Sequence, residues 1–122
     1  SLAQRYGSAE NILSMGFVVN HCPLLLLDEN GRNITPDKLS GQAVTDLMSA
    51  CDEHLREVVE ILAAVRIIGV GKYAQNRALQ TFPNHRNDRI EISSIWHPSP
   101  ASPLANRNDG ADWRENIFKE LP

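Results

Sequence analysis

The 122-residue sequence has few of the features that mark membrane, disordered or metal-binding proteins. Its apolar runs, such as residues 23–27, are strand-sized and far shorter than the ~18 residues of a membrane-spanning helix. Only two cysteines occur, and neither Cys22 nor Cys51 belongs to a CxxC or CxxH spacing, so no metal site is expected. Charged residues make up 22% and hydrophobic residues 42%, which favours a folded globular chain over a disordered one.

The sequence also lacks an initiator methionine and a basic, apolar leader. A trimmed or partial chain is therefore expected. Reduced, buried thiols are the expected state of Cys22 and Cys51, which suits the cytosol or the nucleus, although a disulfide between them stays open.

Acidic residues outnumber basic ones, and the net charge of −3 argues against a general nucleic-acid binder. The balance is uneven, since residues 66–107 carry six Lys and Arg against two Asp and Glu, whereas the remainder carries six against thirteen. A basic stretch in an acidic chain suits a surface that meets phosphates. Chance clustering explains the same composition, so charge alone leaves both interpretations open.

Helix and strand patterns alternate along the chain. Apolar residues recur every three or four positions over residues 40–64, with charged residues mostly on the other side, which predicts an amphipathic helix. The other expected elements are strands at 16–20, 66–70 and 89–96, helices at 72–81 and 112–121, a turn at Asn30-Gly31 and a helix start at Thr35-Pro36. This order predicts right-handed crossovers and a parallel α/β sheet.

Polar or glycine residues follow each expected strand, at Asn20, Gly71 and His97. Ligands of parallel sheets bind beyond the carboxyl ends of the strands. These three positions are therefore expected on one rim, where they would form a site.

Residues 69–74 read GVGKYA and match a GxGxxA dinucleotide fingerprint between a strand and a helix. The fingerprint also needs an acidic residue at the end of the next strand, but Glu91 stands at the start of that strand. A tight turn, in which small residues let the helix pack closely, is the alternative.

The segment His97-Pro98-Ser99-Pro100, followed by Ala101-Ser102-Pro103, is a proline-stiffened loop directly after a strand. Such a loop either inserts into a partner or serves as a simple turn. Taken alone, the segment does not decide between these two interpretations.

The combined motifs are more specific. FVVNHCPLL (17–25), GRNITP (31–36), GVG (69–71) and HPSP (97–100) resemble, in order and spacing, the single-strand-selective monofunctional uracil-DNA glycosylases. The resemblance runs from about Phe17 to Trp113. It implies a three-layer α/β/α fold with a central four-stranded parallel sheet, of which this chain would be the C-terminal part of one domain. It also implies base excision repair in the nucleus, in which the glycosidic bond of uracil or of oxidised uracils such as 5-hydroxymethyluracil is hydrolysed in single- and double-stranded DNA, without metal or cofactor, to leave an abasic site.

By this resemblance, Asn20 matches the base-recognising asparagine and His97 the catalytic histidine. A side-chain amide accepts from uracil N3–H and donates to O4, whereas cytosine presents the reversed pattern. A histidine donor aimed at uracil O2 stabilises the charge of the leaving base, and either protonation state of His97 would serve. A strand-end cap is the structural alternative for Asn20, and a hydrogen-bonded loop residue is the alternative for His97.

The loop from Pro98 to Arg107 matches the family element that enters the duplex while the base is flipped out. Its candidate DNA contacts are Pro98, Ser99, Pro100, Ala101, Ser102, Asn106 and Arg107. Two departures weaken the match, because Ala101 stands where arginine is common and residues 108–112 form a short insertion before Trp113.

No segment resembles the GMNPG-like family loop that positions the attacking water. The chain alone is thus expected to be inactive, incompletely folded, or dependent on a missing N-terminal segment or a second chain. A fragment of a dinucleotide-binding oxidoreductase and a non-catalytic, partner-binding remnant are the alternative functions.

Overall fold

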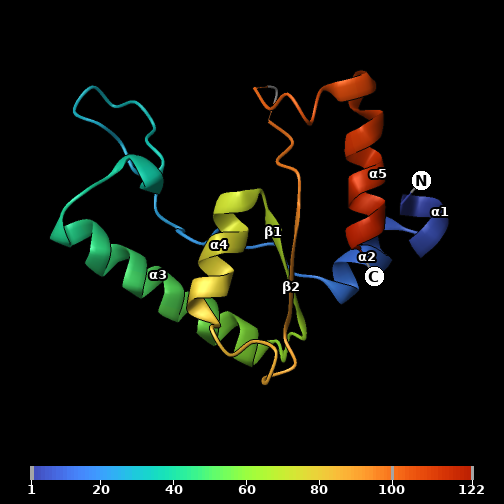
Figure 1. Cartoon of the computed structure of the whole chain (residues 1–122), viewed down its shortest axis with the longest axis horizontal. Helices are drawn as coiled ribbons and strands as arrows, with labels where there is room; N and C mark the ends of the chain where they lie inside the picture. Colours follow the sequence, from blue (N-terminus) through green and yellow to red (C-terminus); the bar gives the residue numbers. More distant parts are fainter. Residues whose placement is uncertain (1, 100, 122) are drawn as a thin grey trace.

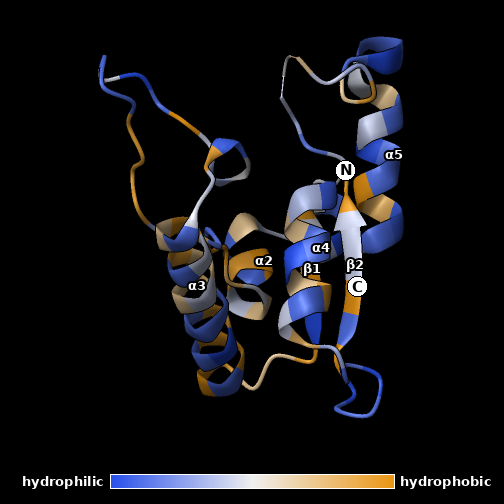
Figure 2. Cartoon of the chain, turned by 60° about the vertical axis from the view of Figure 1, so that its left-hand side comes forward, coloured by the Kyte–Doolittle hydropathy of each residue, from blue (hydrophilic) through white to orange (hydrophobic). Residues whose placement is uncertain are grey.

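The computed structural model describes residues 2–99 and 101–121 (Figure 1). The elements are α1 (Leu2–Tyr6), α2 (Ala9–Met15), the 3-10 turn η1 (Pro36–Lys38), α3 (Gln42–Ile61), β1 (Arg66–Val70), α4 (Lys72–Thr81), β2 (Glu91–Ile95), the 3-10 turn η2 (Arg107–Gly110) and α5 (Ala111–Glu120). Figures 1 and 2 show α3 and α5 on opposite sides of the β1–α4–β2 unit.

The β1–α4–β2 unit confirms the predicted parallel α/β class. The two strands pair in parallel, from Arg66 opposite Glu91 to Val70 opposite Ile95, and α4 forms the crossover. The bounds of β1 and α4 agree with the sequence prediction. Since the described residues form one two-stranded sheet, the four-stranded sheet and the three layers remain predictions.

Strand β2 is shorter than the predicted 89–96 for identifiable reasons. Arg89 has a left-handed backbone with a φ of 57°, which is incompatible with a strand. At the other end, the Trp96 N–H donates to Asn116 Oδ1 and the Trp96 carbonyl accepts from Trp113 Nε1, both at 2.8 Å. The backbone of Trp96 therefore bonds to side chains of α5 and leaves the ladder.

Two glycines explain how α4 follows β1 so tightly. A Cβ at Gly69 would lie 2.4 Å from the backbone nitrogen of Gln75 in α4, closer than real contacts allow. Gly71 has a φ of 89°, which side chains other than glycine rarely adopt. The GVG segment thus shows the close-packed strand-to-helix turn that the sequence offered as the alternative to a dinucleotide fingerprint.

Helix α3 lies within the predicted span 40–64 and is amphipathic, as Figure 2 shows by the hydrophobic and hydrophilic residues around it. It begins after Gly41, whose φ is 95°, and ends before Ala63, which has a left-handed φ of 47°. Its buried residues are Cys51 and Val59, in agreement with the predicted apolar stripe. The helix packs against α4.

The predicted strand at 16–20 is wrong. This segment is irregular in the structure, and Phe17 and Val18 are 65% and 84% exposed. An apolar run becomes a strand only where a neighbour pairs with its backbone, and β1 pairs with β2 alone among the described residues. Asn20 thus follows an irregular segment, while Gly71 and His97 follow strands.

Some of the remaining sequence predictions are confirmed and others are not. Thr35-Pro36 opens only the short η1, and the Thr35 side chain makes no capping hydrogen bond. Asn30-Gly31 forms the expected turn, closed by an antiparallel bridge between Leu27 and Asn33. The helix expected at 112–121 is α5, and the sequence analysis missed α1 and α2.

The buried apolar side chains of the described part are few, namely Cys51, Val59, Ala78 and Ile117. Within residues 2–99 and 101–121, no helix combines the length and apolarity needed to cross a bilayer. The β1–α4–β2 unit, with α3 and α5 beside it, is therefore the frame that positions any site.

Candidate active site

The carboxyl ends of β1 and β2 bring Gly71 and His97 together. The Gly71 N–H donates to the carbonyl of Ile95 at 2.8 Å, which extends the pairing of the two strands by one residue. A Cβ at Gly71 would lie 3.4 Å from the Cβ of His97. Gly71 and the His97 side chain therefore lie within contact distance at this rim.

The hydrogen bonding of His97 defines its tautomer. The backbone N–H of Ser99 donates to His97 Nδ1 at 3.1 Å, so Nδ1 is an acceptor. The ring hydrogen of the neutral imidazole then resides on Nε2. Because the side chain is exposed, this arrangement presents an N–H donor to whatever binds at the rim.

Helix α5 fixes the backbone from which His97 extends. Trp96, the residue before it, is held through both its N–H and its carbonyl by Asn116 and Trp113. This role of Asn116 and Trp113 is not predicted by the sequence pattern, although their spacing of three places both residues on one side of the predicted helix. His97 therefore stands on an anchored residue and precedes the restrictive Pro98.

Asn20 is exposed at the end of the irregular segment. No side chain or backbone group among residues 2–99 and 101–121 forms a hydrogen bond with its amide. The next residue, His21, is instead well fixed, because its Nε2 lies 2.7 Å from Asp52 Oδ1. The His21 ring also meets the ring of Tyr73 edge-on, with centroids 6.4 Å apart. Tyr73 lies two residues after Gly71 in the first turn of α4, so this contact places His21, the residue after Asn20, beside that turn.

Asp52 joins three distant parts of the chain. Its Oδ2 accepts from Arg77 Nη2 of α4 at 2.6 Å, and its Oδ1 faces His21. Burial raises the pKa of the Asp52 carboxyl, but the hydrogen bonds from Arg77 and His21 outweigh burial, and the pKa lies below its ordinary value. The helical period of residues 40–64 predicts only that charged residues lie mostly opposite the apolar stripe. It does not single out Asp52, because helical periodicity does not reveal a tertiary partner.

Residues 98–107 form a compact loop beside His97, with Pro100 outside the described residues. Ser99 organises its start, since its carbonyl accepts from Ser102 N–H at 2.8 Å and its Oγ from Ala101 N–H at 3.2 Å. The Ser102 carbonyl in turn accepts from the backbone of Ala105 and Asn106. The loop is thus locally hydrogen-bonded, and Pro98 and Ala101 are exposed on it.

Arg107, an expected phosphate contact, lies at the far end of this loop. Its Nε is 3.3 Å from Asp112 Oδ2, while Asp112 Oδ1 accepts from Asn108 Nδ2 at 2.8 Å. Asn108 and Asp109, inside the predicted insertion, both have left-handed backbones. Because Arg107 is highly exposed, its guanidinium can exchange Asp112 for a phosphate without burial of charge.

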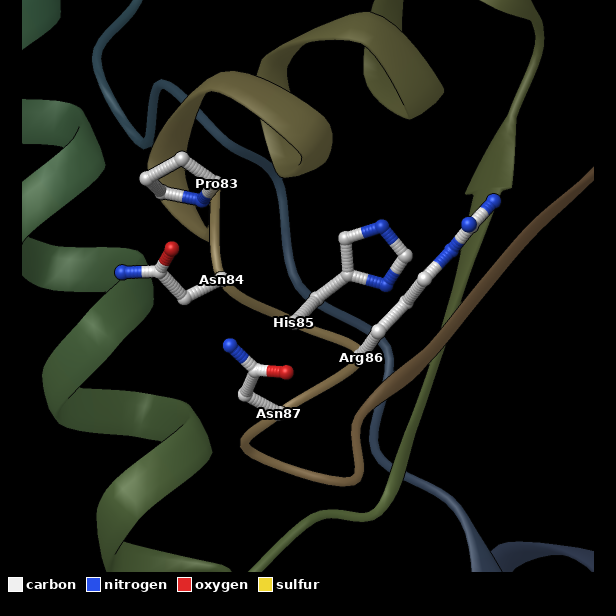
Figure 3. A pocket seen from close by; sticks show the side chains of 5 residues that line it. All are labelled: Pro83, Asn84, His85, Arg86 and Asn87. Atoms are coloured by element: carbon white, nitrogen blue, oxygen red, sulfur yellow. The ribbon is translucent and has the colours of Figure 1, made fainter.

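A metal-binding group and a surface hollow are the other kinds of site to consider. Within the described ranges, no group of three or more His, Cys, Asp and Glu side chains could hold a metal ion. A hollow of about 360 Å³ is lined by Pro83, Asn84, His85, Arg86 and Asn87 (Figure 3). These residues precede β2, so the hollow lies at the opposite end of that strand from His97.

Glu91 is the residue that a dinucleotide site would need for the ribose. It stands at the amino end of β2, and its Oε2 lies 2.6 Å from Arg66 Nη2 of β1. That position is remote from the GVG turn at the carboxyl ends. The geometry therefore gives the dinucleotide interpretation no support.

No family model matches the chain, but curated relatives do. The single-strand selective monofunctional uracil DNA glycosylase of Bos taurus is 36% identical over 111 residues, which are 91% of this chain and 40% of that protein. The enzymes of the same name from Rattus norvegicus and Mus musculus are each 37% identical over 101 residues, 83% of this chain and 36% of theirs. The chain therefore spans about 40% of the length of the curated relatives it matches.

Proposed function

The chain belongs to the single-strand-selective monofunctional uracil-DNA glycosylase family, and on this premise we propose that its protein excises uracil from DNA. The reaction breaks the bond between the sugar C1′ and the base N1, and the bonding electrons leave with uracil. Water supplies the oxygen that joins C1′, and an abasic site remains. Oxidised uracils, action on single- and double-stranded DNA, and a nuclear location form part of the same proposal.

The hydrogen bond from Ser99 N–H to His97 Nδ1 is the observation that carries this proposal. The Ser99 N–H occupies Nδ1, so the imidazole offers its Nε2–H at the carboxyl end of β2. Negative charge develops on uracil O2 as the glycosidic bond breaks. A donor already oriented by a strand end and by Pro98 stabilises that charge with little reorganisation.

Asn20 is proposed to recognise the base. Its amide is exposed and unpaired in the described residues, so both its carbonyl and its NH₂ are available for a pyrimidine edge. In one orientation the amide pairs with uracil, and the same orientation leaves polar groups unpaired against cytosine. Asn20 thus supplies selection, and His97 supplies the donor to the leaving group.

The loop at 98–107 is proposed to enter the DNA beside the flipped nucleotide. Its exposed Pro98 and Ala101 are small and rigid enough to fill a gap in a base stack, and Arg107 is near enough to the loop to contact phosphate. Ala101 in place of arginine removes one charge from this element. We therefore propose a weaker duplex contact than an arginine would give.

The test is excision by the full-length protein. The protein is incubated with matched oligonucleotides that contain one uracil, cytosine or thymine, and alkali then cleaves the abasic sites. Cleavage at uracil alone is expected, and Asn20→Asp should lower it while raising cleavage at cytosine. Absence of cleavage at uracil by the wild-type protein would overturn the proposed function.

A further inference from the structure

His21, Asp52 and Arg77 form a cluster that ties the segment before α3 to α3 and α4. We propose that this His21–Asp52–Arg77 cluster is a positioning device that fixes the backbone at the neighbouring Asn20, and with it the place from which the Asn20 amide reaches the base. The inference rests on the proposed function, because it assigns a purpose to the anchor beside the base-recognising amide.

The geometry of the cluster is that of a two-sided junction. Each oxygen of Asp52 has its own partner, His21 Nε2 at 2.7 Å and Arg77 Nη2 at 2.6 Å. The exposed fractions of the His21, Asp52 and Arg77 side chains are 10%, 16% and 19%, so water competes little for these bonds. Arg77 is itself held, since its Nη1 donates to Gln80 Oε1 at 2.8 Å.

The charge state of Asp52 sets the role of His21. Opposed by burial but favoured by Arg77 and His21, the carboxyl has a lowered pKa and is an ionised acceptor. His21 Nε2 is therefore the donor in their hydrogen bond. The contact is charge-assisted and directional, which fixes the ring as well as the backbone of this residue.

The cluster is not arranged for stability alone. His21 Nδ1 and Arg77 Nε are buried and have no hydrogen-bond partner within the described residues. Buried polar atoms left unpaired cost free energy, and apolar side chains of similar size would avoid that cost. A cluster that keeps such atoms is better explained by the position it imposes.

The residue whose position the cluster fixes is Asn20. Residues 16–20 are irregular, and the Asn20 amide has no partner of its own in the described part of the chain. A hydrogen bond to a pyrimidine edge forms only if the amide lies within reach of that edge, so the place of the Asn20 backbone decides whether the bond can be made. The nearest anchored residue along the chain is His21, and its bond to Asp52 therefore sets the point from which the Asn20 amide extends.

A merely structural role can be separated from a positioning role. The Asp52–Arg77 pair joins α3 to α4 without His21. Loss of the imidazole therefore leaves the helix pair intact and frees only the segment that carries Asn20. His21→Leu removes the donor to Asp52, whereas His21→Gln retains an N–H donor near the place of Nε2.

The first measurement is single-turnover excision by the full-length protein. His21→Leu should lower the rate on uracil by between about tenfold and 10²-fold, the loss expected when a contact group moves by about 1 Å. Its affinity for abasic-site DNA should change less than about threefold, since phosphate contacts remain. His21→Gln should recover most of the rate, and failure of that recovery would contradict the role of the bond to Asp52.

A double-mutant cycle identifies Asn20 as the residue acted upon. In the Asn20→Ala background, His21→Leu should change the rate by less than about twofold, because the group it positions is gone. Glu53→Gln provides the matched control, since it alters an adjacent but exposed carboxylate whose ion pair among the described residues is with Arg56 along α3. Equal losses from His21→Leu with and without Asn20 would mean that the cluster is structural.

Backbone ¹⁵N relaxation tests the cluster without any activity. In the full-length protein, the order parameters of residues 20–22 should fall from the level of rigid backbone, about 0.85, toward about 0.6 in His21→Leu but not in Glu53→Gln. Unchanged order parameters would overturn the positioning role even if uracil is excised. Conversely, lower order parameters in a protein that does not excise uracil would support the cluster and refute only the proposed function.

Discussion

At the scale of single residues, the two ring nitrogens of His97 have different surroundings. Nδ1 accepts from Ser99 N–H, and Nε2 has no hydrogen-bond partner in the described part of the chain. A donor held in this way interacts with charge that forms during the reaction more than with the neutral base. The residue should therefore affect the rate of bond cleavage more than the binding of DNA.

His97→Leu in the full-length protein should lose about 10²–10³ in single-turnover excision rate, equivalent to ~2.7–4 kcal/mol for one oriented donor. Affinity for abasic-site DNA should change far less, because loop and phosphate contacts are kept. His54→Leu on α3 is the matched control and should keep the wild-type rate. The assigned role is refuted by a rate loss below about tenfold, or by an affinity that falls as steeply as the rate.

At the scale of elements, the fit between β1 and α4 depends on Gly69. A methyl group there would meet backbone atoms of α4 at 2.4–3.0 Å, and backbone cannot rotate away as a side chain can. Gly69→Ala should destabilise the protein by about 1–3 kcal/mol, as overpacking does. Urea unfolding measures the effect, with Gly16→Ala as control because its new Cβ would lie 3.7 Å from the Ile12 carbonyl. Equal stability of both variants would contradict the observed packing.

The stability of the α3–α4 interface should depend on pH through the ionisation of Asp52. The folded-state pKa is lowered from 3.8, so ionised Asp52 stabilises the fold above that value. As pH falls through the folded pKa, the unfolded chain has already bound its proton and this stabilisation is lost. At neutral pH, Asp52→Asn should therefore cost about 1–3 kcal/mol, the effect of leaving a buried donor poorly paired.

Urea unfolding of wild type and Asp52→Asn from pH 7 downward measures the contribution of ionised Asp52 to the free energy of unfolding. The difference in unfolding free energy should shrink as pH falls below 3.8, the ordinary value for aspartate. Glu53→Gln should show a small difference, because its pair with Arg56 is exposed. A difference between wild type and Asp52→Asn that stays constant with pH would show that the carboxylate charge contributes nothing at this interface.

At the scale of the whole molecule, the chain spans about 40% of its relatives and leaves apolar residues such as Phe17, Val18 and Leu25 in solvent. Its 122 residues contain no GMNPG-like segment, the loop that the family resemblance leads us to expect for positioning the attacking water. The donor to the leaving base and the base-recognising amide are thus proposed here without a group that activates the nucleophile.

We therefore predict that the isolated 122 residues release no uracil from an oligonucleotide, as measured by alkaline cleavage. The full-length protein assayed in parallel serves as the control. Robust cleavage by the 122 residues alone would mean that they themselves position the water.

The sequence by itself determined the elements whose pattern is local. Helix α4 and strand β1 have the predicted bounds, and α3 follows its apolar period, because spacing and turn residues are written in the chain. The motifs around Asn20 and His97 also indicate the family from the sequence alone, in agreement with the curated relatives. The strand predicted at 16–20 failed, since a strand exists only through hydrogen bonds to a neighbour that no local pattern can specify.

The tertiary structure alone decided the relations between distant residues. The tautomer of His97 follows from one backbone hydrogen bond, and the end of β2 follows from Trp113 and Asn116 on a later helix. Asp52 is a polar residue on an amphipathic helix, yet its side chain is mostly covered between His21 and Arg77. Side-chain partners of this kind depend on how elements pack, and packing brings together residues that the sequence keeps far apart.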